Sequence, residues 1–386
     1  MRRFLSLFLL SFFLLNCSSD SSDFPDNNVI QEEETNNDES STSFNKTGLL
    51  TNLSDNMIIP YYEQLYFKIS DFYTIVLANT DMEFNLGTIR NYRDWYDFVN
   101  ATWQRASIYN FGPAIDLNLR DNVNSYPLDV VQLTQNVESG IYDLSAPQNT
   151  FAKGFPAIEY LLNIGDSDSE TEQILNGPNR EAYYAYLVAV LEDLEQLFGT
   201  VLGEWRSSYR DTFIAATQNS STGSINIVAN EMIRNFEEEI RFKKIGNPIG
   251  VCTGVLNPDL LETPHSSFDF SKQWSINGML GIIELFNGLY FIPETGSANG
   301  LSFDDYLNFM SDMNGTINAD AVNSCLNGST QLMSDVSISF REDILNNGGA
   351  NLQLIYNECG ACINLMKDQM LSALDINLNY TYVECN

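Results

Sequence analysis

The chain is best understood from one stretch near its middle, Lys153-Gly154-Phe155-Pro156-Ala157-Ile158-Glu159-Tyr160-Leu161-Leu162. Pro156 suits the first turn of an α-helix, because its φ is already near the helical value and its missing N–H would be unbonded there. The apolar residues recur every three to four positions and so share one helix face. The stretch therefore predicts a helix start that carries a single carboxylate, Glu159, among apolar neighbours.

Glu159 has two interpretations. It lies within about one turn of the predicted helix N-terminus, where the helix dipole favours a negative charge by roughly 0.3 to 1 kcal/mol, so it would serve simply to stabilise the helix. If it is buried instead, an unpaired charge would cost several kcal/mol, and it must therefore have polar partners. The second interpretation predicts that Glu159 is shielded, hydrogen-bonded and part of a polar pocket.

The rest of the chain repeats apolar residues at the spacing of amphipathic helices, and helix packing explains its aromatic residues better than a cofactor platform does. The polar segment from Gln218 to Ser224 interrupts this pattern and predicts a domain boundary. The sequence thus predicts an all-α fold of two tandem helical-bundle halves, residues 46–219 and 224–386. The stripes are Tyr62, Leu65, Ile69, Phe72 and Val76; Tyr92, Trp95, Val99 and Trp103; Tyr183, Tyr186, Val190, Leu194, Leu197, Val201 and Trp205; Ile225, Val228, Met232, Phe236 and Ile240; and Leu352, Ile355, Cys359, Cys362, Met366 and Met370.

The first 45 residues predict export. Residues 1–16 contain two arginines followed by an apolar run. The run is shorter than the roughly 20 residues that a membrane-spanning helix needs, so the segment resembles a removable signal peptide. Cys17 follows as the lipid-acceptor cysteine of a bacterial lipoprotein would, with a plainly secreted protein as the alternative. Residues 17–45 are acidic, lack lysine and arginine, and carry few large apolar residues, so they predict a flexible tether.

The charge of the chain limits its partners. There are 51 acidic residues against 19 basic ones, for a formal net charge of −32. Nucleic-acid binding is excluded on this ground, because its affinity depends on lysine and arginine neutralising phosphates. An acidic exterior suits an exported soluble protein and would concentrate cations nearby.

Gly154, Glu159 and the following Tyr-Leu-Leu resemble the signature of the imelysin-like family, Gly-x-His-x-x-Glu followed by a short apolar run. Pro156 stands at the position of the signature histidine, so one of the two side chains that would face a shared metal ion is missing. A second segment is similar to the family in the same order along the chain, with a Phe-Gly turn at 111–112 and Asn-x-aromatic-Pro-Leu-Asp at 124–129.

The resemblance implies a pocket where the signature helix meets the second half, in which similarity continues at 246–250, 261–268 and 277–281. Asp129 has an alternative role as a helix cap, for which aspartate is an ordinary choice. The ligand-binding residues that the resemblance implies are Glu159, Lys153, Asn124 and Asp129, with Ser266 and Ser267 from the second half.

His265 is the only histidine of the chain, which excludes metal sites built from several histidines. His265 is interpreted as a surface or supporting residue. The alternative, a nucleophilic Ser–His pair with the serine next to it, is disfavoured because the glycine-framed turn that usually presents such a serine is absent from the sequence.

Five cysteines remain after Cys17, and in an exported protein they predict one or two disulfides in the C-terminal half and one free thiol, with the connectivity open. They are Cys252, Cys325, Cys359, Cys362 and Cys385.

Two functions follow from the resemblance. The first is a lipoprotein held at the cell envelope, in the outer membrane. It would bind a metal, a metal complex or another small ligand between its halves and would serve iron acquisition, with an envelope protein as a further partner. The second is a metallopeptidase that uses Glu159. Pro156 and the single histidine favour the first function, in which iron or another divalent cation is the implied cofactor and no peptide bond is cut.

Overall fold

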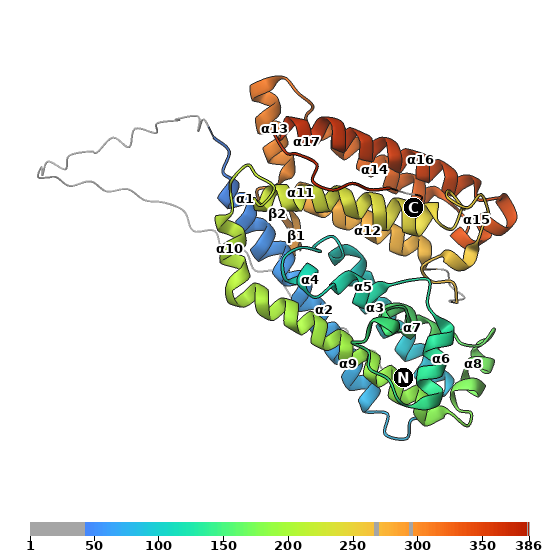
Figure 1. Ribbon diagram of the computed structural model, residues 1–386. Helices are drawn as coiled ribbons and strands as arrows, with labels where there is room; N and C mark the ends of the chain where they lie inside the picture. Colours follow the sequence, from blue (N-terminus) through green and yellow to red (C-terminus); the bar gives the residue numbers. More distant parts are fainter. Residues whose placement is uncertain (1–42, 266–269, 293–295, 384, 386) are drawn as a thin grey trace, which may run out of the picture. The chain divides into compact units, whose positions relative to one another are not determined.

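Long helices with one buried face build the first half of the chain (Figure 1). The structure is a computed structural model that describes residues 43–265, 270–292, 296–383 and 385. The predicted signal peptide, Cys17, most of the predicted tether, Ser266 and Ser267 lie outside these described residues. The long helical runs are α1 (Lys46–Asn52) continued by the π-helical η1 (Leu53–Ile58) and α2 (Ile59–Leu77), then α3 (Leu86–Ala106), and then α9 (Arg180–Glu204) continued by the π-helical η3 (Trp205–Tyr209) and α10 (Arg210–Ala215).

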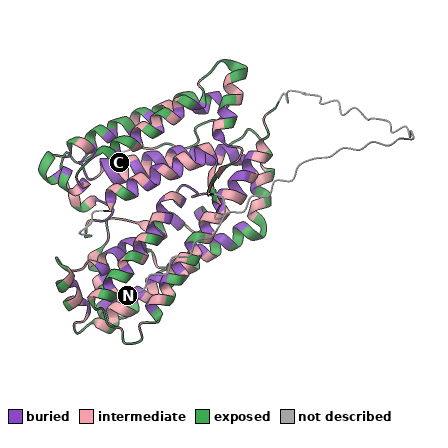
Figure 2. Ribbon diagram, turned by 180° about the vertical axis from the view of Figure 1, so that it is seen from behind, coloured by how far each residue is buried: buried purple, intermediate pink, exposed green. Residues whose placement is uncertain are grey.

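The apolar stripes of these helices are buried where the sequence predicts. All five stripe residues of α2 are buried, and so are Tyr92, Val99 and Trp103 of α3, while Trp95 is half-buried. Helix α2 packs against both α3 and α9. Figure 2 shows that buried residues follow the inner faces of the helices and exposed residues the outer faces.

Short elements connect α3 to α9 and carry the signature stretch. The Tyr126–Pro127 peptide bond, between α5 and α6, is cis. The elements are α4 (Pro113–Asp116), α5 (Leu119–Asn124), α6 (Val130–Ser139), the 3₁₀ helix η2 (Pro147–Ala152), α7 (Gly154–Leu162) and α8 (Asp168–Leu175).

The second half is a further set of helices with a small hairpin. Helix α12 packs on α14, and α14 packs on α16, which places these three side by side in Figure 1. The helices are α11 (Ser224–Arg234), the π-helical η4 (Asn235–Gly246), the 3₁₀ helix η5 (Pro258–Leu260), α12 (Ser271–Asn287), α13 (Phe303–Asn314), α14 (Ala319–Asp335), α15 (Phe340–Asn347), α16 (Ala350–Leu365), the π-helical η6 (Met366–Met370) and α17 (Leu371–Ala373).

The all-α prediction is confirmed except for one two-stranded sheet. Strand β1 (Leu289–Ile292) pairs with β2 (Gly296–Asn299) in antiparallel fashion, with Leu289 opposite Asn299 and Phe291 opposite Ser297. Each strand has only four residues, which is too short for an alternating pattern to distinguish it from a helix end.

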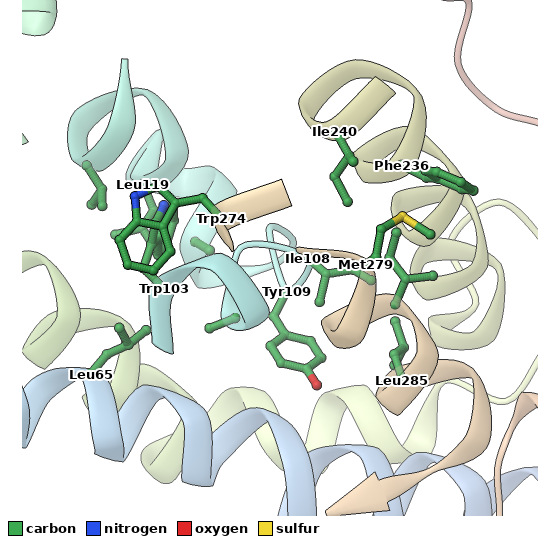
Figure 3. Close-up of a cluster of buried hydrophobic side chains, with 14 of the residues drawn as sticks. Leu65, Trp103, Ile108, Tyr109, Leu119, Phe236, Ile240, Trp274, Met279 and Leu285 are labelled. Atoms are coloured by element: carbon green, nitrogen blue, oxygen red, sulfur yellow. The ribbon is translucent and has the colours of Figure 1, made fainter. Parts of the chain in front are cut away.

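One hydrophobic core runs through both halves. Figure 3 shows Ile108 and Tyr109, just after α3, among Ile240, Met279 and Leu285 of the second half. The close approach of α12 to α3 depends on glycine, because a Cβ at Gly281 would lie 2.5 Å from the Arg105 carbonyl oxygen. Residues 44–386 accordingly form one compact unit, and the predicted boundary at 218–224 falls in the loop between α10 and α11.

Two disulfides lie in the C-terminal half. Cys325 of α14 is bonded to Cys362 of α16, and Cys252 is bonded to Cys385. Cys359 is the buried free thiol. The prediction of disulfides with one thiol left over is therefore confirmed. In the part of the chain that the structure describes, no helix has both the length and the apolar character to cross a bilayer.

Candidate functional site

The signature helix α7 begins at a glycine for a steric reason. Gly154 has φ +71°, in the left-handed region, and a Cβ there would lie 2.2 Å from the carbonyl oxygen of Val123. Only glycine allows both the conformation and the close approach of α7 to the end of α5. At its other end, α7 is held by Arg93 of α3, whose guanidinium Nη2 donates to the Leu162 carbonyl oxygen at 2.7 Å.

Glu159 lies at the centre of this fixed helix and is 1% exposed. Its Oε1 accepts a hydrogen bond from the backbone N–H of His265 at 3.1 Å. The His265 ring meets the edge of the Tyr160 ring, with 5.0 Å between centroids, and burial lowers the pKa of His265. The only histidine of the chain thus lies against the signature helix, but it reaches Glu159 through its backbone and not through its imidazole.

A second buried carboxylate, Glu262, lies in the segment before His265 and is 3% exposed. Its Oε1 accepts from the Gln104 side chain at 2.6 Å and from the Asn124 side chain at 2.7 Å. Its Oε2 is paired with the ammonium of Lys244, which also donates to Gln104 Oε1 at 2.8 Å. These four residues, which we call the Glu262 network, come from α3, α5, η4 and the 261–265 segment, so they join the two halves.

Polar residues on one side of α3 extend the Glu262 network towards α7. Gln104 donates to Asn100 Oδ1 at 3.0 Å, and Asn100 donates to the Tyr96 hydroxyl at 2.9 Å. Burial is the main reason that the pKa of Tyr96 is raised, and the charges of Glu159, Glu262 and Asp97 raise it further. Three carboxylates therefore surround one buried tyrosine.

Among the described residues, three buried polar atoms of the first half, one on α3 and two at the junction, have no hydrogen-bond partner, although the groups around them are paired. They are Asp97 Oδ1, Asn124 Oδ1 and the Tyr126 hydroxyl. Burial, with the nearby charge of Asp94, raises the pKa of Asp97 to about 7 in spite of Arg93. Leaving a buried polar group without a partner costs about 1 to 3 kcal/mol, so a ligand or water that supplies the missing bonds would be favoured there.

A polar cavity of about 790 Å³ opens beside His265. It is bounded by charged residues from both halves, among them the Arg93–Asp168 pair and the Arg341–Asp259 pair. A volume of this size is in the range of small-molecule sites. The signature helix therefore ends at a cavity that a polar solute can enter.

The structure separates the predicted site residues. Asn124 lies in the Glu262 network and Glu159 lies beside His265, both at the junction of the halves. Lys153 is 2% exposed and is paired with Asp193 of α9 at 3.0 Å, on the side of α9. Asp129 is exposed, and its carboxylate accepts from the backbone N–H of Gln132 at 2.9 Å, which is the helix-cap role.

Sequence reasoning missed Glu262, Lys244, Gln104 and Tyr126 as members of the junction, and it missed Asp97 as a carboxylate of α3 with a buried oxygen. Gln104 and Asp97 carry a usable signal, because polar residues on the packed side of a long amphipathic helix require partners. Glu262 and Lys244 carry no such signal, since their pairing with the first half depends on how the two halves meet.

The donor atoms at the junction suit hydrogen bonding better than metal coordination. Among the described residues, no three histidine, cysteine, aspartate or glutamate side chains converge so that they could hold a metal ion. Pro156 contributes no donor, and the Glu262 carboxylate is already engaged by three side chains. The described residues therefore do not fit a bare metal ion, whereas a metal that arrives inside its own chelate would need only hydrogen bonds.

Comparison with known proteins shows a family for the chain and solved structures with a similar fold. The family model described as Imelysin, peptidase M75, matches residues 89–293, a span that holds both Glu159 and Glu262. A protein from Parabacteroides distasonis described as an iron-regulated protein A precursor has a similar fold, with TM-score 0.67, 15% identity, and coverage of 86% of this chain and 94% of its own. An imelysin-like protein from Psychrobacter arcticum has TM-score 0.63, 16% identity, and coverage of 87% and 97%. No curated protein matches the sequence.

Proposed function

Because this chain belongs to the imelysin family, we propose that it is an envelope-anchored binding protein that holds a metal complex or another small polar ligand where its two halves meet. We further propose that it serves iron acquisition and does not cleave peptides. The description of one structural relative as an iron-regulated protein supports the link to iron.

One observation carries the binding proposal, namely the buried polar atoms of α3 and of residues 124–126 that have no partner in the part of the chain that the structure describes. Asp97 Oδ1 and Asn124 Oδ1 are acceptors, and the Tyr126 hydroxyl is a donor and acceptor. A ligand with hydroxyl groups, which both donate and accept, would satisfy all three atoms, whereas a carboxylate group would satisfy only the Tyr126 hydroxyl. The Lys244 ammonium, 6.0 Å from the centroid of the Tyr126 ring, is already paired with Glu262, so recognition of the ligand rests on hydrogen bonds.

Ferric citrate is a direct probe of this proposal, with citrate alone as its metal-free counterpart. We expect the purified chain to bind ferric citrate saturably in calorimetry, and Asn124→Ala and Tyr126→Phe each to weaken it by about tenfold, the effect of losing one good hydrogen bond. Glu138→Gln is the matched control, because Glu138 is exposed on α6. Equal affinities of the parent and both variants would contradict the proposal.

The peptidase alternative is tested at Pro156. A catalytic zinc typically needs three protein ligands and a water, and the signature here offers Glu159 without an imidazole. We expect the parent to show no chelator-sensitive peptidase activity, and Pro156→His to gain metal, measured as metal content after dialysis. Chelator-sensitive proteolysis by the parent would refute the proposal.

A further inference from the structure

A second cavity, of about 520 Å³, lies on a different face of α3 from the Glu262 network. Helix α3 contributes Phe98, Ala101, Thr102 and Arg105 to it, at the spacing of one helix face. The opposite walls come from α2, α12 and the hairpin, and the cavity shares no lining residue with the one beside His265. Its volume is that of a small-molecule site.

Lys68 of α2 is the first notable group of this cavity. Its ammonium donates to the Thr102 hydroxyl at 2.6 Å and lies 3.7 Å from the centroid of the Phe98 ring. Its hydrogen-bond partner is thus a neutral hydroxyl, and among the described residues no carboxylate forms an ion pair with it. Burial and the charge of Arg105 both lower the pKa of Lys68, which shows that its charge is incompletely compensated. An ammonium has three donors, so Lys68 retains capacity for an anionic acceptor.

Arg105 is the second cation, and its carboxylate partner is already occupied. Arg105 is paired with Glu284 of α12, and its Nε donates to Asn277 Oδ1 at 3.4 Å. Glu284 also accepts from the Tyr61 hydroxyl at 2.5 Å. The charged lining residues are thus two cations and one carboxylate. In a chain of net charge −32, such a local positive excess is a specific attraction for an anion.

The rim of the cavity is aromatic. Phe98 is 51% exposed and Phe291 of β1 is 71% exposed, and Tyr290 lines the cavity beside it. Large exposed apolar side chains around a polar centre are a feature of binding sites. We propose that this cavity binds a small organic anion, a carboxylate on an aromatic body, with the carboxylate at Lys68 and Arg105 and the ring against Phe98 and Phe291.

The test uses the full chain and two fluorescent probes of the same shape, 2-naphthoate and its uncharged analogue 2-naphthamide. We expect saturable one-to-one binding of 2-naphthoate, at least about tenfold tighter than that of the amide. Salt should weaken this binding, because the carboxylate of the probe forms an ion pair with the Lys68 ammonium. Lys68→Met should lower the affinity for 2-naphthoate by about ten- to a hundredfold, and Lys68→Arg should retain most of it.

Lys272→Met is the matched control, because Lys272 is also half-buried and donates to one neutral oxygen, that of Val336 at 2.9 Å. It should leave 2-naphthoate binding unchanged, as should Asn124→Ala at the junction, which separates this site from the one proposed above. The absence of saturable binding, equal affinity for the two probes, or an unchanged affinity in Lys68→Met would each overturn the proposal.

Discussion

At the residue scale, Gly154 shows how a signature position can be fixed by sterics and not by chemistry. Its φ of +71° and the 2.2 Å approach of a Cβ to Val123 together exclude any side chain. We expect Gly154→Ala to lower the free energy of unfolding by about 2 to 4 kcal/mol, from left-handed strain plus displacement of α5. Chemical denaturation with urea measures it.

Gly203 provides the control for that substitution. It is an exposed glycine inside α9, and a Cβ there would meet nothing within 4 Å. Gly203→Ala should therefore raise the free energy of unfolding by about 0.5 to 1 kcal/mol, because alanine is the better helix former. A Gly154→Ala protein as stable as the parent would show that α7 can start without its glycine.

Asp97 gives the second residue-scale prediction, which concerns pH. Its pKa is about 7 in the folded protein, against about 3.9 in an unfolded chain, so the folded state holds a proton that the unfolded state has lost. The free energy of unfolding should therefore fall as the pH rises from about 4 to about 7 and then level off. The groups nearby are Asp94, Arg93 and, across Tyr96, Glu159 and Glu262.

Asp97→Asn should remove this dependence. At pH 8 the variant should be more stable than the parent by about 1 kcal/mol, a modest figure because Asp97 as a whole is only half-buried, whereas near pH 4 the two should be equal. Thermal unfolding at both pH values checks it. If the variant is less stable than the parent at pH 8, the ionised Asp97 carboxylate does not destabilise the folded protein, and the prediction is wrong.

At the scale of elements, the sequence predicts the amphipathic helices, whose buried faces follow from the local spacing of apolar residues, and it predicts little else. The stripe of α2 is buried as expected, and so is that of α9 apart from Tyr183 and Leu197, which are half-buried, because the periodicity of an amphipathic helix is contained in its own sequence. The π-helical η4 escapes prediction, since its residues repeat like those of an α-helix while its backbone is wound more widely. Lys244 of η4 and Glu262 pair with each other inside the second half, and both were missed because their contacts with Gln104 and Asn124 form only when the halves pack.

The Cys325–Cys362 disulfide makes an element-scale prediction, because it ties α14 to α16 across a separation of 37 residues. Replacing both cysteines by serine should lower the free energy of unfolding by about 2 to 4 kcal/mol, mainly through a freer unfolded chain. Cys359→Ala is the control, since Cys359 is a buried free thiol in the same region and its loss should cost only about 1 kcal/mol. Urea unfolding under non-reducing conditions distinguishes the two, and equal losses would mean that the cross-link contributes nothing beyond packing.

At the scale of the whole molecule, one core joins two sets of helices, and the polar junction lies within it. Periodicity predicted both sets of helices, and the family resemblance pointed to Glu159 and Asn124 at the junction. The helix-cap role that the sequence offered for Asp129 is the one seen at α6, whereas the pairing of Lys153 with Asp193 could not be predicted, because it depends on the path of the chain between α5 and α9.

The last prediction concerns where the whole molecule is held, and it rests on the sequence before residue 43. A cysteine directly after a signal-like segment predicts lipidation, and each buried CH₂ of an acyl chain contributes roughly 0.8 kcal/mol to membrane binding. Cys17→Ser should remove the acceptor sulfur and shift the protein from the membrane fraction to the soluble fraction. Ser18→Ala, one residue further, is the control and should stay with the membrane. Because net charge −32 gives no attraction to an anionic bilayer, a Cys17→Ser protein that still sediments with membranes would mean that another contact holds it there.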